Sequence, residues 1–452
     1  MKTFFLLLFV IIPYCCFSQD DTCYSYIELG IGYPPVKNDS QMVITKLYFD
    51  TLDVDHLRFD EDWEWREPTQ GIYNWNSIHS RIGWIIQNNY KLLLTIKPNG
   101  PDWACNTQVQ NDYACLIEDT VSFKKYLDSL FTRYAEYIDK VQFGNETLSE
   151  DFWPGNMEDF VTLNNITYDR LKNISPQTPF VLSGFSSGVL MRYAACHTTE
   201  FFTFYYKYWI TSQYSEDSLC AKTWVQEEAQ KLEYLLANAH YDMVDLHLYD
   251  DVEIWNYKYD VIRDLVPDKP FIVGEFGGPH TYAETDAADE TYQADRLYQY
   301  IKTLDSLKFN YPDTTDVYYF KLIERGNDST SHGYSGLLAL QGDTSVRRKP
   351  TFDIYEAFEP CTPVSIHHHP DNSSTGTVYP NPVYYNSVIT VENRDNSIHT
   401  LYIYDTSGKR IKKEDFYGNK AEINKKDYSG GLYFYYILKN NSIICKGKFI
   451  IL

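Results

Sequence analysis

The chain has 452 residues, with 62 acidic against 40 basic side chains and a formal net charge of −22 at pH 7. This excess of negative charge repels phosphate backbones and no basic stripe offsets it, so nucleic acid is not an expected partner. Hydrophobic residues make up 44% of the chain and aromatic residues 17%, which indicates a folded, aromatic-rich protein rather than a disordered acidic one. The length allows one large domain together with a small one.

Residues 1–18 are typical of a secretory signal peptide. Lys2 supplies the positive end, residues 4–12 form an apolar core, and residues 16–18 offer a small-x-small cleavage site. The mature protein is therefore expected to begin near Gln19. No other stretch approaches the roughly 20 uninterrupted apolar residues that a membrane helix needs, so no transmembrane segment is expected in the mature chain.

Seven of the nine cysteines remain once Cys15 and Cys16 leave with the signal peptide, and export permits disulfides. Metal ligation is the alternative, weakened by the absence of a C-x-x-C pair. Sequence alone does not fix connectivity, so the pairings remain hypotheses. Proximity favours Cys105–Cys115, Cys196–Cys220 and Cys23–Cys361, with Cys445 left over.

Between residues 24 and 360, short apolar runs rich in β-branched and aromatic residues alternate with longer segments of helical period. Amphipathic helices are expected, for example, at residues 121–137 and 223–239. The eight repeats predict an α/β fold, a closed (β/α)8 TIM barrel over residues 19–360. The expected strands are residues 26–33, 55–60, 91–97, 140–146, 180–185, 243–249, 271–276 and 317–323.

A doubly wound open sheet is the structural alternative, because Gly30 and Gly32 follow the first strand as in a dinucleotide-binding loop. Pro35 stands where that loop requires its third glycine, which argues against a nucleotide cofactor. The chain also lacks a Walker loop, an H-E-x-x-H helix and a G-x-S-x-G elbow.

Composition shifts after Pro360 to a linker, residues 361–377, which includes His367-His368-His369. The histidine run is a potential metal ligand set, but no carboxylate or cysteine flanks it and a solvated patch is favoured. Residues 378–452 show short strands separated by turns and predict a small all-β, sandwich-like domain.

This tail resembles the C-terminal sorting domain of cargo for the type IX secretion system of Bacteroidetes. The resemblance rests on YPNP at residues 379–382, YDTSGK at 404–409, SGGLY at 429–433 and a lysine-bearing final strand. It implies that the secretion machinery is a partner through residues 378–452, and that the protein is exported across the outer membrane and then released or attached to the cell surface. A carbohydrate-binding or spacer domain is the alternative.

Two glutamates close strands of the expected barrel. Glu146 ends the fourth run and Glu275 the seventh, and strands four and seven face each other across the mouth, where the active face of such barrels lies. Two carboxyl groups in one cleft suit cleavage of a glycosidic bond, because one protonates the leaving oxygen while the other attacks the anomeric carbon or activates water. No cofactor and no metal ion are required for this chemistry.

The same positions resemble clan A of the glycoside hydrolases, retaining enzymes whose acid/base follows an asparagine on strand four and whose nucleophile ends strand seven. Asn145-Glu146 and Glu275 match this pattern. The resemblance implies that Glu146 is the general acid/base and Glu275 the nucleophile. Asn145 is expected to hydrogen-bond the sugar 2-hydroxyl, an interaction that strengthens at the transition state.

Arg58, at the end of the second strand, and His247 and Tyr249, on the sixth, agree with the clan. Arg58 is expected to form an ion pair with the nucleophile, Tyr249 to donate to it, and His247 to line the same wall. For each, a satisfied polar residue inside the barrel is the alternative. Residues 57–75 also look like the early region of β-xylosidase-like family 39.

Trp103 and Trp153 follow strand ends and are candidate stacking platforms for sugar rings, with packing beneath a loop as the alternative. The eighth strand departs from the clan, since residues 318–324 lack the tryptophan that many members carry there. Tyr319 or Lys321 is a candidate substitute.

Four acidic residues cluster after the second strand. A solvated acidic rim is expected there, with a calcium site as the alternative, because no known calcium-loop spacing is present. The four residues are Asp60, Glu61, Asp62 and Glu64.

The sequence therefore predicts an exported retaining glycoside hydrolase that acts on a poly- or oligosaccharide through a glycosyl-enzyme intermediate. A catalytically inactive barrel that binds glycans at the cell surface is the alternative, and an adhesion protein without sugar recognition is a third hypothesis.

Overall fold

The computed structural model divides into two compact units, Met1–Cys361 and Thr362–Leu452. The signal peptide, Cys23, Cys361 and the linker histidines lie outside the described residues, so the expectations for them stay predictions. The described residues are 27–198, 216–249, 251–278, 289–324, 331–341, 345–358, 377–391, 398–405, 409–439 and 442–451.

Eight parallel strands form the barrel of the first unit, in the order β7-β6-β3-β2-β1-β10-β9-β8. Parallel bridges from Val181 to Met243 and from Phe185 to Leu246 join the two ends of this order. The sheet is therefore closed, which confirms the barrel and makes the open-sheet alternative wrong. The strands are β1 (Glu28–Gly32), β2 (His56–Glu61), β3 (Lys91–Ile96), β6 (Lys140–Phe143), β7 (Phe180–Val181), β8 (Val244–Leu248), β9 (Phe271–Phe276) and β10 (Asp316–Tyr319).

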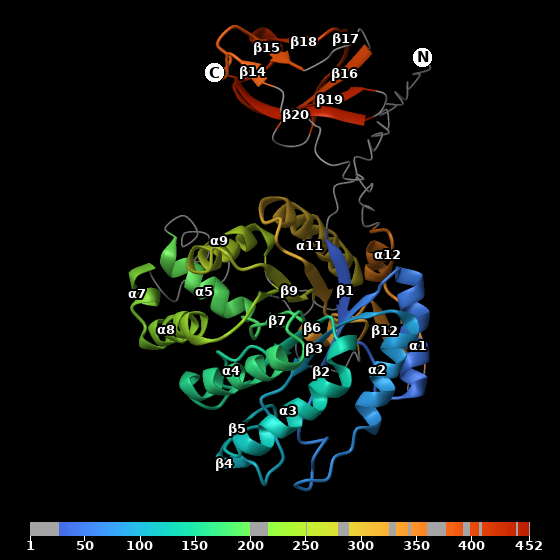
Figure 1. Cartoon of the computed structure of the whole chain (residues 1–452), viewed down its shortest axis with the longest axis vertical. Helices are drawn as coiled ribbons and strands as arrows, with labels where there is room; N and C mark the ends of the chain where they lie inside the picture. The colour runs from blue at the N-terminus through green and yellow to red at the C-terminus, as the bar shows by residue number, and fades with distance from the viewer. Residues whose placement is uncertain are drawn as a thin grey trace, which may run out of the picture. The chain divides into compact units, whose positions relative to one another are not determined.

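Helices surround the strands (Figure 1). Both example helices are present, and α8 buries the apolar positions spaced at the helical period, including Val225, Leu232 and Leu235. Asn38 and Asp119 begin two helices by accepting a backbone N–H of the first turn. The longer helices are α1 (Asp39–Leu52), α2 (Asn76–Asn88), α3 (Thr120–Tyr134), α4 (Met157–Ile174), α5 (Ser187–His197), α8 (Thr223–Asn238), α9 (Trp255–Leu265) and α11 (Glu290–Asn310).

The barrel interior is layered along the strands. The lowest layer is charged, the next is apolar, and the one below the mouth is polar, as expected when inward-facing residues of alternate strands fill the barrel. The apolar layer consists of Leu93, Val181, Met243, Ile272 and Tyr318. The polar layer above it includes Arg58, Thr95, Gln142 and Asp245, all fully buried.

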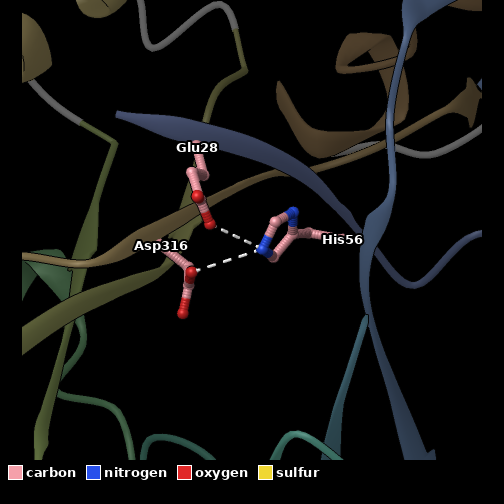
Figure 2. Close-up of side chains that lie close together, drawn as sticks. All are labelled: Glu28, His56 and Asp316. Carbon is pink, nitrogen blue, oxygen red and sulfur yellow. Dashed lines mark ion pairs between the residues drawn. The ribbon is translucent and has the colours of Figure 1, made fainter. Parts of the chain in front are cut away.

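The charged layer centres on His56, which is 2% exposed and reaches between Glu28 and Asp316 (Figure 2). Its Nε2 lies 2.8 Å from Oε2 of Glu28 and 3.5 Å from Oδ1 of Asp316, and its Nδ1 lies 2.5 Å from Oδ1 of Asp55. Burial opposes the positive charge, but the Asp55 and Glu28 carboxylates outweigh it and raise the pKa of His56 to about 9. Lys140 pairs with Asp316 at 2.6 Å, so the base of the barrel is an ion-pair network.

Two disulfides are present among the described cysteines. Cys105 and Cys115 join β4 (Cys105–Gln110) to β5 (Cys115–Ile117), with their Cα atoms 5.8 Å apart. Cys196 and Cys220 are joined with a Cα separation of 5.6 Å. Two of the three pairings predicted from proximity are thus confirmed, and the third lies outside the described residues. Cys445 is buried and forms no disulfide with another described cysteine, as expected.

The second unit is all-β. A three-stranded sheet has the order β14-β15-β18 and a four-stranded sheet the order β17-β16-β19-β20. One buried core takes Ile389 and Ile423 from the first sheet and Leu401 and Ile437 from the second, so the expected sandwich-like arrangement is confirmed. The strands are β14 (Thr377–Tyr379), β15 (Asn386–Thr390), β16 (Ile398–Asp405), β17 (Arg410–Tyr417), β18 (Lys420–Asn424), β19 (Gly431–Lys439) and β20 (Ser442–Ile451).

Candidate active site

Arg58 organises the polar layer beneath the barrel mouth. Its side chain is fully buried, and β2 carries it inward from the third residue of the strand. A guanidinium has five N–H donors in a fixed fork, which suits a site with several acceptors. Its hydrogen bonds go to Thr95 Oγ1 (3.0 Å), Gly274 O (3.0 Å), Glu275 Oε1 (2.9 Å), Gln142 Oε1 (2.8 Å) and Asn145 Oδ1 (2.6 Å).

Glu275 is held at both carboxylate oxygens. Oε1 accepts from Arg58 in the ion pair expected from the sequence, and Oε2 accepts from the Tyr249 hydroxyl at 2.5 Å. The residue is 7% exposed and is the last but one of β9. Hydrogen bonds at both oxygens fix the direction in which the carboxylate points.

Glu146 follows β6 in a left-handed backbone conformation, with φ of 45°. A non-glycine residue pays roughly 1 kcal/mol or more for this geometry, and such residues gather at functional sites. One Glu146 oxygen lies 2.7 Å from Nδ1 of His247. Ligand-type atoms of Glu146, His247 and Glu275 all lie within 4.8 Å of one another, so the two expected carboxyl groups meet in one place.

His247 lies between the two glutamates and is fully buried. Its Nδ1 is 3.7 Å from Glu275 Oε2, and its Nε2 is 3.3 Å from Oδ2 of Asp245. Burial opposes the charge, but the carboxylates of Glu275, Asp245 and Glu146 raise the pKa of His247 to about 10. The ring fits because residue 184 is glycine: a Cβ there would lie 2.2 Å from Nε2.

The backbone of Tyr249 is fixed from both sides. Its N–H donates to Oγ of Ser187 at 3.1 Å, and its carbonyl accepts from the Tyr300 hydroxyl at 3.1 Å. The Ser187 hydroxyl in turn accepts from the fully buried ammonium of Lys258 at 2.7 Å. These contacts hold the phenol where it reaches Glu275.

Sequence reasoning missed several groups in this network. Gln142 donates to Oδ2 of Asp245 at 2.7 Å, and the backbone N–H of Gly274 donates to Oδ1 of the same residue at 2.5 Å. Tyr33 lies with its ring under the Arg58 guanidinium, 5.0 Å from its centroid. Asp245 could have been predicted as part of the network, because it is a charged residue inside the largely apolar strand β8. A charged residue in that position needs hydrogen-bond or ion-pair partners in order to be buried.

Neither suggested tryptophan platform lies in the network. Trp153 is 2% exposed, donates its indole N–H to the Asn156 carbonyl, and packs on Phe160, so the alternative of packing beneath a loop describes it. Trp103 is partly buried, packs edge-on against Trp63 and donates to the Glu67 carbonyl at 3.2 Å.

On the eighth strand, Tyr319 is not at the mouth. It is 3% exposed and packs outside the barrel against Phe276 and Tyr355. Phe320 is the ring beside the site, with its centroid 6.5 Å from that of Tyr249 and 6.0 Å from that of Tyr33. The suggestion of Tyr319 as a substitute is therefore wrong, because strand alternation turns it into the helix layer.

The acidic residues after β2 do not converge on one point. Glu61 is 1% exposed and pairs with Arg66 and, at 2.6 Å, with Arg81. A solvated acidic rim is therefore wrong for Glu61. Asp62 pairs with Lys97 at 3.3 Å.

Two groups of described residues bring metal-type ligand atoms together, at His56 and at His247. In each, a ring nitrogen already lies within 2.8 Å of a glutamate oxygen. The raised pKa values of both histidines place a proton where a metal ion would need a lone pair. The donor sets therefore fit ion pairs better than a metal.

The second unit has a recognisable family. Residues 377–452 match the family described as the secretion system C-terminal sorting domain. This tail sends the chain out by type IX secretion, to the cell surface or the surroundings. No curated protein matches the chain, and none of the described helices is long and apolar enough to cross a membrane.

Solved structures share the fold. A monomeric β-xylosidase from Caulobacter crescentus CB15 aligns with a TM-score of 0.51 and 12% identity, over 88% of this chain and 94% of that one. A β-glucosidase aligns with a TM-score of 0.50 and 13% identity, over 70% of this chain and 87% of that one. A family 39 glycoside hydrolase from Bacteroides cellulosilyticus WH2 gives 0.45 and 13%, over 89% and 81%. The first two likenesses show that the chain shares the (β/α)8 barrel fold with these solved structures.

Proposed function

We propose that this exported barrel hydrolyses O-glycosidic bonds of a poly- or oligosaccharide with retention of configuration. Glu275 is the nucleophile and Glu146 the general acid/base. The observation that carries the proposal is the close approach of two glutamate carboxylates, one oxygen of each lying within 4.8 Å of the other, in the loop after β6 and near the end of β9. Retaining glycosidases hold their carboxyl groups about 5 Å apart, whereas inverting enzymes need roughly 6.5–9.5 Å to admit a water.

In the first step, a Glu275 oxygen attacks the anomeric carbon while the bond to the leaving oxygen breaks. Glu146 delivers its proton to that oxygen, and His247 Nδ1, 2.7 Å from a Glu146 oxygen, keeps its own proton and donates a hydrogen bond to the carboxylate that forms. The products are a glycosyl ester of Glu275, the released alcohol and an ionised Glu146. Arg58 and Tyr249 aim the attacking carboxylate, which favours a near-attack geometry.

In the second step, Glu146 takes a proton from water as the water oxygen attacks the anomeric carbon. The ester bond breaks, Glu275 returns to a carboxylate, and the sugar is released with its original configuration. Asn145 has its carbonyl oxygen engaged by Arg58, which leaves its amide nitrogen to donate to the sugar 2-hydroxyl.

The test is hydrolysis of a panel of 4-nitrophenyl β-glycosides and plant polysaccharides by the full secreted protein. Glu275→Ala and Glu146→Ala should each abolish cleavage, and azide should restore turnover of an activated aryl glycoside by Glu146→Ala, giving a β-glycosyl azide. Glu136→Ala, which removes an exposed carboxylate at the far end of the barrel, should behave as wild type. Unchanged cleavage by Glu275→Ala contradicts the assignment, and a folded protein that binds glycans without cleaving any is a binding barrel instead.

A further inference from the structure

Asp60 lies at the barrel mouth but takes no part in the network around Glu275. It follows Arg58 by two residues on β2, so both side chains are on the inward face of the strand. Asp60 pairs in register with Thr95 of β3, whereas Arg58 pairs with Leu93. Asp60 is therefore two residues closer to the mouth than Arg58. Burial and the negative charge of Asp60 raise the pKa of Tyr33, whose ring contacts the Arg58 guanidinium. Besides burial, the charge of Glu275 in turn raises the pKa of Asp60. The carboxylate therefore borders the reaction centre.

The Asp60 carboxylate has no partner within the described part of the chain. Its Oδ1 is buried without a hydrogen bond, and no ion pair is formed by either oxygen. Burial raises the pKa of Asp60 to about 6, against the opposing charges of Lys97 and Arg58. Leaving a buried acceptor unsatisfied is costly, and native proteins rarely keep such a group without a functional reason.

Lys97 directly follows the adjacent strand, β3, and supplies a donor near this acceptor. Its ammonium lies 3.3 Å from Oδ2 of Asp62 and 5.6 Å from the ring centroid of Tyr113. Of the charged neighbours, it exerts the strongest opposing effect on Asp60. The mouth thus presents a free carboxylate acceptor next to an ammonium donor.

We propose that Asp60, with Lys97 beside it, binds two vicinal hydroxyls of the sugar ring at the reaction centre and selects the configuration of that sugar. The carboxylate accepts from one hydroxyl and the ammonium donates to its neighbour. A site built to bond a hydroxyl rejects an analogue that lacks it, because the buried polar group is then left unpaired. The assignment rests on the proposed function and makes Asp60 a specificity residue.

The test compares wild type with Asp60→Asn on 4-nitrophenyl β-glycosides of glucose, galactose, mannose and xylose, and on deoxy analogues of the preferred sugar. Asp60→Asn should lower kcat/KM on the preferred sugar at least 30-fold. It should also reduce the ratio of kcat/KM between the preferred sugar and its epimers. Its effect should be under 3-fold on the one deoxy analogue that lacks the bonded hydroxyl. Asp50→Asn makes the same chemical change on the outer helix α1, where Asp50 is exposed, and should change nothing.

Thermal unfolding supplies a readout that a structural residue would not give. Because Asp60 has no partner to lose, Asp60→Asn should keep or raise the melting temperature while activity falls. If Asp60→Asn keeps the kcat/KM and the epimer preference of wild type, the inference is overturned. The glycosidase assignment is left standing in that case. If wild type cleaves nothing, the monosaccharides are titrated by calorimetry: tenfold weaker binding by Asp60→Asn supports the inference, while equal binding, or no binding by wild type, overturns it.

Discussion

Arg58→Lys is the sharpest test of the network, because lysine keeps the positive charge but not the fork. The guanidinium donates five hydrogen bonds from a fully buried position, and an ammonium has three donors on a single atom. At least two acceptors are left unpaired, each costing about 1–3 kcal/mol. The free energy of unfolding should therefore fall by about 2–6 kcal/mol, the sum of two such costs.

The same change should slow the attack by Glu275. A loss of about 3 kcal/mol in the orientation of the nucleophile corresponds to roughly a 100-fold decrease in kcat. A 2,4-dinitrophenyl glycoside isolates this step, because its leaving group needs no proton. Urea unfolding followed by tryptophan fluorescence measures the stability.

Arg170→Lys is the matched control, since Arg170 pairs with Asp128 on the outer helices and is far more exposed. It should change the free energy of unfolding, and the activation free energy that corresponds to kcat, by less than about 1 kcal/mol each. An Arg58→Lys protein within 1 kcal/mol of wild type in stability, with kcat within 5-fold, would refute the reasoning. The stability measurement stands even if no substrate is found.

Three other outcomes are expected. Tyr249→Phe removes only the hydroxyl that donates to Glu275, so kcat should fall roughly 10- to 100-fold with little change in melting temperature; an unchanged kcat contradicts this. The pKa of His56 is about 9 in the folded protein, above its unfolded value of 6.5. Its contribution to stability is therefore complete below pH 6.5 and is lost as the pH rises through 9. The loss should reach up to about 3 kcal/mol in the free energy of unfolding measured with urea. His56→Gln should flatten that dependence, and an equally steep fall in the variant argues against it. Replacing Cys105 and Cys115 by serine should lower the free energy of unfolding by about 3 kcal/mol, and unchanged urea midpoints would contradict the expectation.

The barrel was predictable because each strand and helix carries its own period. All eight expected strands are present, and β9 begins and ends where the sequence places it. The meeting of Glu146 and Glu275 also follows from topology, since closure brings the ends of strands four and seven to one mouth.

What escaped prediction depends on which way a side chain turns. Tyr318, Tyr319 and Phe320 are consecutive aromatics of similar size, and composition does not distinguish them. Strand alternation does: Tyr318 faces the barrel interior, Tyr319 the helices, and Phe320 the site. Trp153 was unpredictable in another way, because its burial depends on a contact with Phe160, on the helix that follows its loop.

The apolar layer of Leu93, Val181, Met243, Ile272 and Tyr318 keeps two hydrogen-bonded, charged networks of one barrel structurally separate. Among the contacts of the described residues, no hydrogen bond or ion pair crosses this layer to link His56 below with Arg58 above. Substitutions in the lower ion-pair network can therefore be made to increase tolerance to heat or alkali while the hydrogen bonds of the upper network are kept. Natural variation at the two levels is likewise free to follow separate pressures, on stability below and on the proposed chemistry above.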